Sequence, residues 1–445
     1  MPHIKKPRPY AEILALHLPD MLQLVQRFSA VDQKGRYLHW HDFRHRVPPD
    51  TNAEAAWGAV KFSRNIILKP IELTAEDGQP FQYCLPDYAQ TVIHDIEHIN
   101  AKLGLGASNT SNEQSNTFLV ESLMMEEAIS SAQLEGAATT RKVAKEMLEK
   151  EREPLNDDER MIFNNFMLMK LAKHSKALPL SLELIRRFHA EATRDIQEEQ
   201  ACPGEIRRTN DIYVKGRNEE IAHQPPDAAL LLERLERLCD FANANHDGHD
   251  GRTFIHPAVK AIILHFMIGY EHPFNDGNGR TARGIFYWCM LKNSYWAFEY
   301  ISISALLKQA PVQYGESYLF TETDDFDLTY FIYYQLRIIE RAMNGFLSYI
   351  EIKRKDFHDV VGLLTESGFD KHLNFRQVHL LQKVLRNPGR LFVAKEVKND
   401  FDVSEGTARA DLEKLVKLKL LAKTTEGKTH CYVARGDAAA QIRKK

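Results

Sequence analysis

Cysteine is scarce in this sequence, and its few copies are scattered. Cys84, Cys202, Cys239, Cys289 and Cys431 form no CxxC pair, and their number is odd. This pattern argues against a disulfide framework and against a cysteine-based zinc site. We expect reduced thiols that are mostly buried.

Long apolar runs are also missing. No stretch approaches the roughly 20 apolar residues that a helix needs to cross a bilayer. The first 28 residues lack both an uninterrupted apolar core and a small-residue cleavage site, which is not typical of a signal peptide. The sequence therefore predicts a cytoplasmic protein that is not held in a membrane.

Three common ligand-binding patterns are absent. There is no alternation of strands and helices, which argues against a Rossmann-type sheet. The tripeptide GKT at Gly427 is no P-loop, because Ala422 stands where the first glycine is needed. An EF-hand loop fails too, because counting back from Gly279 places Phe274 at the first ligand position.

The charge of the chain is unevenly distributed. Its residues are 44% hydrophobic and 27% charged, as in globular proteins. The length of 445 residues exceeds that of one ordinary domain, so we expect two or three domains. From residue 371 onward there are 17 Lys and Arg against 8 Asp and Glu, a net charge of +9. The preceding residues carry −12, so the C-terminal end is expected to have a different role.

Helical spacing dominates the chain, and three regions are predicted. Residues 1–115 form a mostly helical extension that ends in a polar linker, Gly106–Asn116. Residues 116–352 form a helix bundle with one β-hairpin, Asp211–His223. Residues 360–445 give helix, helix, helix and hairpin, which is the order of a winged helix-turn-helix domain. The predicted fold is therefore mainly α, with a small hairpin and a C-terminal winged helix.

The densest chemistry lies in HPFNDGNGRTAR, residues 272–283, which follows a predicted buried helix. His272 has an ordinary pKa near 6.5, which suits a general base. The glycines allow backbone N–H groups to converge on an anion at the N-terminus of the next helix. Asp276 offers one carboxylate, and Mg²⁺ is usually held by one carboxylate and substrate phosphates. Arg280 and Arg283 are three residues apart, so they share a helix face and can clamp phosphate oxygens.

This stretch matches in full the signature HPFx(D/E)GNGRxxR and resembles the Fic family of protein adenylyltransferases. The likeness extends over about Asn116–Tyr349. The resemblance implies a Fic-type helical bundle that transfers AMP from Mg-ATP to a Tyr, Thr or Ser hydroxyl of a target protein.

The resemblance also implies a role for each residue of the motif. His272 would take the proton of the target hydroxyl as it attacks the α-phosphate, and Asp276 would hold Mg²⁺. Asn278 would contact phosphate or ribose, and the two Arg would neutralise the β- and γ-phosphates. The implied nucleotide- and phosphate-binding residues are Gly277, Asn278, Gly279, Arg280 and Arg283.

The hairpin around residues 211–223 resembles the flap of the family. An exposed edge could pair with an extended target segment by β-addition and bring its hydroxyl to His272. Alternatively, the hairpin only covers the nucleotide. The residues predicted for flap and target docking are Asp211, Ile212, Tyr213 and Val214.

A second motif, SSAQLEG at residues 130–136, resembles the inhibitory motif (S/T)xxxE(G/N) of the family. Ser131, Glu135 and Gly136 occupy its fixed positions. A glutamate at a helix C-terminus is unfavourable for the helix dipole, which indicates that another force holds it. By the likeness, Glu135 pairs with Arg283 and blocks the γ-phosphate position, so the enzyme would be autoinhibited. Glu135 could also position a water that removes AMP from targets.

The basic C-terminal region leaves a second function open. Thr407, Arg409 and Lys414 lie where a recognition helix could meet DNA, although many winged helices instead contact protein. The alternative function is a DNA-binding transcriptional regulator that uses the Fic site as a nucleotide sensor. The intact His272 favours the enzyme, because a sensor needs no base. No adenine-reading residue is identified, so a nucleotide donor other than ATP stays open. The sequence also leaves open whether the chain forms a homodimer.

Overall fold

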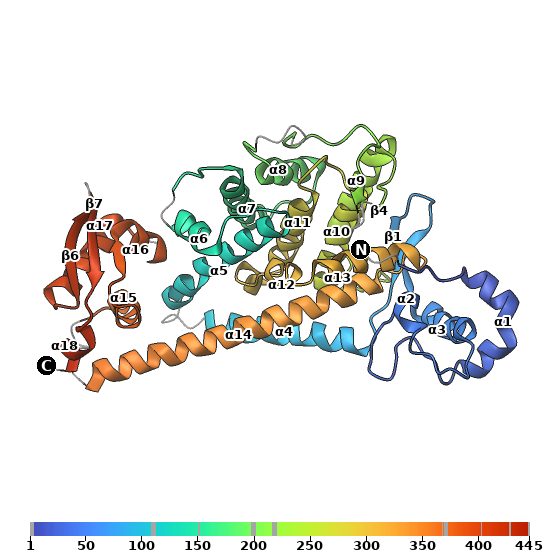
Figure 1. Cartoon of the computed structure of the whole chain (residues 1–445), viewed down its shortest axis with the longest axis horizontal. Helices are drawn as coiled ribbons and strands as arrows, with labels where there is room; N and C mark the ends of the chain where they lie inside the picture. Colours follow the sequence, from blue (N-terminus) through green and yellow to red (C-terminus); the bar gives the residue numbers. More distant parts are fainter. Residues whose placement is uncertain are drawn as a thin grey trace. The chain divides into compact units, whose positions relative to one another are not determined.

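The computed structural model describes residues 4–107, 113–149, 152–196, 202–215, 220–366, 368, 373–401, 403–426 and 429–443. These residues fold mainly into helices, with a few short antiparallel strands (Figure 1). The chain divides into two compact units. Unit 1 comprises Met1–Leu103, Glu126–Thr139 and Pro154–Ala342, and unit 2 comprises Gly104–Met125, Thr140–Glu153 and Met343–Lys445. Among the described residues, no helix combines the length and apolarity needed to span a membrane.

The elements of unit 1 are mostly helices, and three of them, α4, α5 and α14, contribute residues to both units. In chain order they are α1 (Tyr10–Leu24), α2 (Trp40–Phe43), α3 (Ala53–Ile67), β1 (Lys69–Thr74), β2 (Pro80–Tyr83), α4 (Asp87–Ala107), α5 (Glu113–Leu134), α7 (Asp157–His174), α8 (Leu182–Ala192), β3 (Val214–Lys215), β4 (Ile221–His223), η1 (Ala228–Leu230), α9 (Leu231–Asn243), α10 (Pro257–Glu271), α11 (Asn278–Lys292), η2 (Trp296–Glu299), α12 (Ser304–Leu307), α13 (Pro311–Thr323) and α14 (Thr329–Glu366).

Helix α10 forms the core of unit 1, as the apolar sequence predicts. Pro257 occupies the first turn, where its missing N–H is not needed, and the ring of His256 accepts a hydrogen bond from the Ala258 N–H. Nearly every residue of α10 is buried, and α11 packs along it (Figure 1). A side chain at Gly269 would meet Tyr318 on α13, so this close approach requires glycine.

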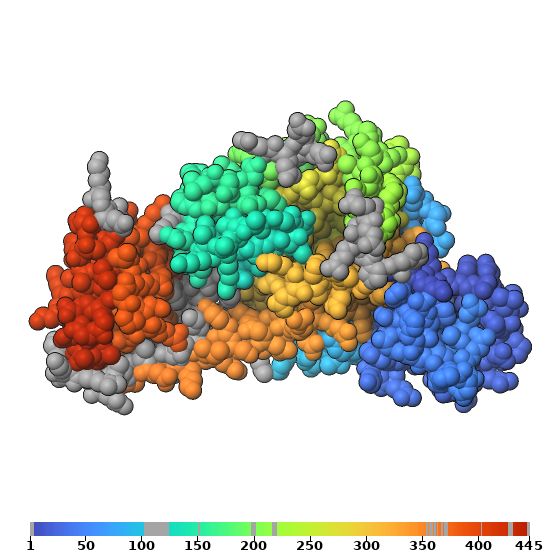
Figure 2. Space-filling model, viewed as in Figure 1, coloured from blue at the N-terminus to red at the C-terminus, as the bar shows by residue number. Residues whose placement is uncertain are grey.

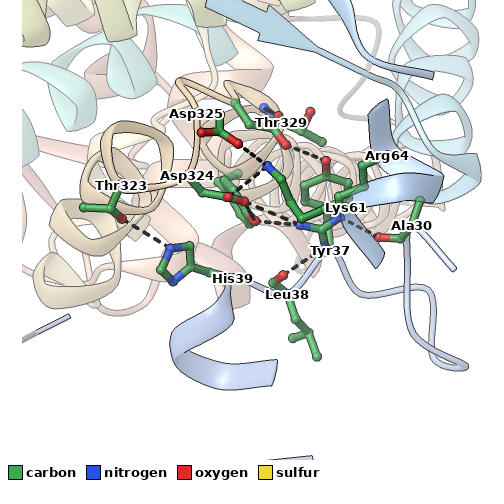
Figure 3. Close-up of polar contacts among 12 residues, drawn as sticks. Ala30, Tyr37, Leu38, His39, Lys61, Arg64, Thr323, Asp324, Asp325 and Thr329 are labelled. Atoms are coloured by element: carbon green, nitrogen blue, oxygen red, sulfur yellow. Dashed lines mark hydrogen bonds and ion pairs between the residues drawn. The ribbon is translucent and has the colours of Figure 1, made fainter. Parts of the chain in front are cut away.

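The N-terminal residues are joined to the turn between α13 and α14 by a buried ionic network (Figure 3). Lys61 Nζ on α3 lies 2.9 Å from both Asp324 Oδ1 and Asp325 Oδ2. Arg64 donates to the Tyr330 hydroxyl at 2.6 Å and to two backbone carbonyls. Because Lys61, Arg64 and Asp324 are buried, each charge depends on the others to offset its desolvation. The network therefore fixes the start of α14 and the end of α13 to the lobe formed by α1 to α3 (blue in Figure 2).

Two features of the N-terminal region differ from what the sequence indicates. The hairpin β1–β2 was not predicted from the sequence. The polar stretch Gly106–Asn116 is not a linker at its ends, because α4 runs to Ala107 and α5 begins at Glu113. Small polar residues were read as a break, but helix ends tolerate them. Residues 108–112 lie outside the described residues.

The five cysteines are free, and all but Cys202 are buried, which confirms the expected scattered thiols. No group of three or more His, Cys, Asp and Glu side chains in the described ranges is arranged to hold a metal ion. His39, the residue before α2, has a packing role. His39 stacks on Phe320 with ring centroids 4.4 Å apart.

Unit 2 contains a helical group with a three-stranded sheet of order β5-β7-β6. Its further elements are α6 (Arg141–Glu149), α15 (Phe375–Arg386), β5 (Leu391–Val393), α16 (Ala394–Phe401), α17 (Glu405–Lys417), β6 (Leu421–Glu426), β7 (Thr429–Ala434) and α18 (Ala438–Arg443). The three predicted helices and the hairpin are present, and the side chain of Ser404 caps α17 by accepting from the Thr407 N–H. Strand β5 and α18 were not predicted, because three residues are too few to show a strand period.

Candidate active site

His272 lies directly after α10, at a residue with left-handed backbone angles, φ 45° and ψ 58°. Its Nδ1 is 3.2 Å from the carbonyl oxygen of Gly269. A carbonyl only accepts, so Nδ1 carries the hydrogen and Nε2 keeps a free lone pair. The ring retains some exposed surface, yet the surrounding atoms desolvate it. This burial lowers the pKa of His272 to about 4, against the opposing effect of the Gly269 carbonyl.

The low pKa of His272 makes a prediction for the free chain. As the pH rises, the ring should lose its proton at a pH below the ordinary histidine pKa of about 6.5. The neutral form should persist at all higher pH values. Histidine-selective NMR over a pH series will check this, with the His272 signal assigned by its loss in His272→Ala. A midpoint at or above the ordinary value would contradict the desolvated ring.

Arg207 fixes the backbone around His272. Its Nε donates to the His272 carbonyl at 2.9 Å, and one terminal nitrogen donates to the carbonyl of Pro226 at 2.5 Å. The backbone N–H of Arg207 donates to the carbonyl of Pro273 at 2.9 Å. Because Arg207 is buried, these bonds are shielded from water and hold the turn after α10. The sequence gives no signal for this role, since 65 residues separate Arg207 from His272.

Asn278 closes the glycine loop upon itself. Its Oδ1 accepts from the N–H of Phe274 at 2.9 Å, and its Nδ2 donates to the Phe274 carbonyl at 2.7 Å. Gly277 precedes α11 with φ 77°, and a side chain there would meet Thr193 on α8. The side chain of Asn278 thus holds the loop, and the loop backbone and the N-terminus of α11 have the N–H groups that could bind an anion.

His189 on α8 packs against the loop between α10 and α11. Its ring stacks on Phe274 with centroids 3.7 Å apart. Nδ1 accepts from the Gly204 N–H at 2.9 Å, so Nε2 carries the hydrogen and donates to the Asp276 carbonyl at 2.8 Å. His189 therefore holds the backbone of the residue that was predicted to bind the metal.

Arg280 is turned inward in the structure. One terminal nitrogen donates to the carbonyl of Ala192 at 2.9 Å, and the other lies 2.5 Å from Asp276 Oδ2. The side chain is buried. Its guanidinium thus joins the end of α8 to the loop and orients Asp276, and its predicted contact with phosphate stays a prediction.

Arg283, which the sequence predicts to bind phosphate, lies against the second motif. Its Nε donates to Ser131 Oγ at 2.8 Å, and Nη2 lies 2.8 Å from Glu135 Oε1. The pairing that the resemblance implied is therefore present, although 148 residues separate the two. A side chain at Gly279 would collide with Glu135 Oε1, so this carboxylate lies directly against the first turn of α11. Glu135 thus occupies the position at which an anion would meet both Arg283 and the helix N-terminus.

Glu127 anchors the helix that carries Ser131 and Glu135. Its Oε2 accepts from Ser302 Oγ at 2.7 Å and from the Ser304 N–H at 3.1 Å, and Oε1 accepts from Ser304 Oγ at 2.5 Å. Burial raises the pKa of Glu127, and these donors oppose the rise. Sequence reasoning missed this residue, because its partners lie more than 170 positions away. Helix α5 is thereby fixed one turn before Ser131.

The predicted hairpin is present as the short pair β3–β4, in which Val214 pairs with His223; its role as a flap stays a prediction. It is shorter than expected, because Asp211, Ile212 and Tyr213 precede the first strand. Tyr213 and Ile221 expose 42% and 58% of their surface. Residues 216–219 lie outside the described residues.

Asp276 fits the donor set that Mg²⁺ uses. Its side chain is 35% exposed, its Oδ1 makes no hydrogen bond or ion pair with the described residues, and Arg280 steadies Oδ2. Mg²⁺ keeps several waters and takes one or two carboxylates beside substrate phosphates, so a preformed protein cage is not needed.

The comparisons with known proteins agree with this geometry. A model of the Fic/DOC family matches residues 179–290. The protein adenylyltransferase Fic of Drosophila sechellia and that of Drosophila melanogaster are each 37% identical over 92 residues, 21% of this chain. The match spans only 16% of the length of those relatives.

Two solved structures have a similar fold. A Fic family protein from Desulfovibrio desulfuricans G20 has a TM-score of 0.50 and 16% identity, over 78% of this chain and 96% of that one. Fic-1 from C. elegans has a TM-score of 0.50 and 14% identity, over 77% of this chain and 85% of that one. At these identities the likeness concerns the fold alone.

Proposed function

We propose that this chain, whose residues 179–290 match the Fic/DOC family, is a protein adenylyltransferase that transfers AMP from ATP to a Tyr, Thr or Ser hydroxyl of a target protein. The observation that carries the proposal is the neutral His272, whose Nε2 lone pair is free and which directly precedes the loop that is predicted to bind phosphate. The 37% identical relatives are named protein adenylyltransferases, which supports the same reaction.

The proposed reaction balances on the groups at hand. The target hydroxyl oxygen attacks the α-phosphorus of ATP, and its proton passes to Nε2 of His272. The bond between the α-phosphorus and the bridging oxygen to the β-phosphate breaks, so pyrophosphate leaves and an AMP ester remains. The Nδ1–H of His272 stays bonded to the Gly269 carbonyl, which stabilises the imidazolium that forms.

The phosphates would be held by the loop backbone, the N-terminus of α11 and Arg283, whose Nη1 has no partner in the described structure. Asp276 is the residue that would hold Mg²⁺. When bound, Mg²⁺ neutralises phosphate charge. Arg280 holds the carboxylate of Asp276, and His189 holds its backbone carbonyl.

We further propose that Glu135 inhibits the enzyme. Its carboxylate pairs with Arg283 and lies against Gly279, where a γ-phosphate would need the same donors. The anchoring of α5 through Glu127 keeps this carboxylate in place. Glu135 is also 27% exposed, so it can reach water, and removal of AMP from a modified target is a second activity to assay at this site.

The transfer is tested with ATP labelled at either phosphate. The chain, Mg²⁺ and a cell lysate are incubated with α-labelled or γ-labelled ATP, using wild type and Glu135→Gly. We expect protein-bound label from α-labelled ATP alone. Label from γ-labelled ATP would mean phosphoryl transfer, and no label from either donor with Glu135→Gly would overturn the proposal.

For unit 2 we propose a winged helix-turn-helix domain that binds DNA. Helices α15, α16 and α17 precede the hairpin β6–β7 in the order of that domain. Arg409, Lys414 and Lys417 are exposed along α17, and Glu405 pairs with only one of them, Arg409. The helix therefore offers two unbalanced lysines to a phosphate backbone.

Salt dependence tests the DNA proposal. We expect a fluorescent DNA duplex to bind with an affinity that falls steeply with salt, and the double variant Lys414→Ala, Lys417→Ala to lower the slope of log K against log salt by about 2. Anisotropy titrations at several salt concentrations measure this. Binding that ignores salt, or a slope that the variant leaves unchanged, would contradict it. Binding that changes with ATP in a chain that transfers no AMP would favour the nucleotide-sensing regulator.

A further inference from the structure

One buried side chain connects the hairpin β3–β4 to two helices of unit 1. His223, the last residue of β4, places Nδ1 2.7 Å from Glu322 Oε2 on α13. Its Nε2 lies 2.8 Å from the backbone oxygen of Tyr270 near the end of α10. The residue is only 7% exposed, so water does not compete for these bonds.

The two partners of His223 define its protonation state. A carboxylate and a backbone carbonyl both accept hydrogen bonds, so each ring nitrogen must donate. A neutral imidazole has only one N–H and would leave one pair of acceptors facing each other. Both contacts are therefore satisfied only by the imidazolium cation.

The charges around His223 agree with a cation. Burial opposes it, but the hydrogen bond and charge of Glu322 outweigh burial and raise the pKa of His223 above its ordinary value. Glu271 on α10 adds a second negative charge, although Arg234 on α9 pairs with it at 2.7 Å. The nearby His272 is neutral, so it does not repel the cation.

His223 stands between the hairpin and the candidate base. Its strand partner is Val214 on β3, and its carbonyl partner, Tyr270, precedes His272 by two residues. We propose that the His223 imidazolium is a positioning residue that holds the hairpin against the end of α10, in register with His272, and that the hairpin is released when the ring loses its proton. Whether this hold on the hairpin affects a bound target segment rests on the proposed adenylyl transfer.

The direction of the pH effect follows from the raised pKa. A group with a folded pKa above its unfolded value stabilises the folded arrangement fully below the unfolded value, near 6.5 for His. That contribution is lost as the pH rises through the folded value. The hairpin should therefore be held at pH 6 and released in alkaline solution.

Two isosteric variants separate the two bonds. The amide nitrogen of His223→Asn falls near the Nδ1 position and can keep the bond to Glu322. His223→Gln places its amide nitrogen near Nε2 and can keep the bond to the Tyr270 carbonyl. Neither variant carries a charge or titrates. A matched control is His246→Asn, because His246 is also buried near a carboxylate, Glu72, but lies outside the hairpin.

Hydrogen exchange of the full chain, read by mass spectrometry on peptides covering 211–215 and 220–224, measures the hold directly. At pH 6 we expect wild type and His246→Asn to exchange more slowly than either His223 variant by about tenfold, the scale of one charge-assisted hydrogen bond. At pH 9 the difference should disappear. Comparison at equal pH removes the intrinsic pH dependence of exchange. Equal exchange at pH 6, or a difference that persists unchanged at pH 9, would overturn the role of His223.

Histidine-selective NMR gives an independent readout, with the His223 signal assigned by its loss in both variants. We expect both ring nitrogens to be protonated at pH 7, and Glu322→Gln to shift the midpoint downward. A neutral ring at pH 6 would overturn the proposal even if exchange changed. Both readouts use the chain alone, so they decide the role of His223 whether or not AMP transfer is found.

A transfer assay tests the link to the reaction. In the Glu135→Gly background with lysate proteins, the rate of AMP transfer should fall between pH 6 and pH 9 more steeply when His223 is present than when it is replaced by Gln. Parallel pH profiles would contradict the link.

Discussion

Replacing His272 with Ala should lower the rate of AMP transfer by about 10²- to 10⁴-fold, the usual contribution of a positioned general base. The reason is local. Nε2 is the one lone pair that the Gly269 contact leaves free on this ring, and the low pKa of His272 keeps it free at neutral pH. The measurement is protein-bound label from α-labelled ATP under single-turnover conditions, in a Glu135→Gly background.

ATP binding should survive this substitution. The loop backbone, Arg283 and Asp276 do not depend on the imidazole, because Asn278 and His189 hold the loop independently of it. Calorimetric titration with Mg-ATP and thermal unfolding are the controls. Label that persists at the parental rate would contradict the base. A loss of both ATP binding and thermal stability would instead assign His272 a structural role.

The sequence predicts the parts of this site that are contiguous or periodic. Helix α10 is apolar on nearly all sides, so its burial follows from composition. The motif from His272 to Arg283 places its chemistry within one loop and one helix turn. The contact between Glu135 and Arg283 came from resemblance alone, because spacing cannot bring together residues 148 positions apart.

The supporting contacts could not be predicted, since each joins distant segments. Arg207, His189 and His223 are ordinary polar residues in the sequence. Their roles depend on which backbone carbonyl lies opposite, and only the fold decides that. The same holds for Lys61 and Asp324, which are 263 positions apart.

Asn278 and Arg280 show a further limit of reasoning from a motif. Both are polar residues beside a predicted anion site, and both face inward in the structure. Where a tight loop packs against α8, the buried carbonyl groups of both the loop and the helix end need hydrogen-bond donors. Asn278 supplies one for Phe274, and Arg280 supplies one for Ala192. The motif therefore encodes the loop's own support as well as its ligand contacts.

Replacing Glu135 with Gly should raise AMP transfer by about 10- to 100-fold. A charge-assisted hydrogen bond contributes roughly 1.5–3 kcal/mol, and each 1.4 kcal/mol corresponds to about a factor of ten. The substitution removes the carboxylate from Nη2 of Arg283, which keeps its bond to the Ser131 carbonyl at 3.2 Å, and uncovers the backbone at Gly279. Initial rates with α-labelled ATP, compared at equal protein concentration, measure the gain.

The matched control is Glu236→Gly, which removes an exposed carboxylate from the middle of α9 and should leave the rate unchanged. Ser131→Ala should give a smaller gain than Glu135→Gly, because it removes the bond to Nε of Arg283 and leaves the carboxylate on Nη2. The gain from Glu135→Gly should vanish when His272→Ala is added, since freeing the phosphate position cannot replace the base. An unchanged rate in Glu135→Gly would remove the inhibitory role. A gain that survives without His272 would mean that the carboxylate restrains a different reaction.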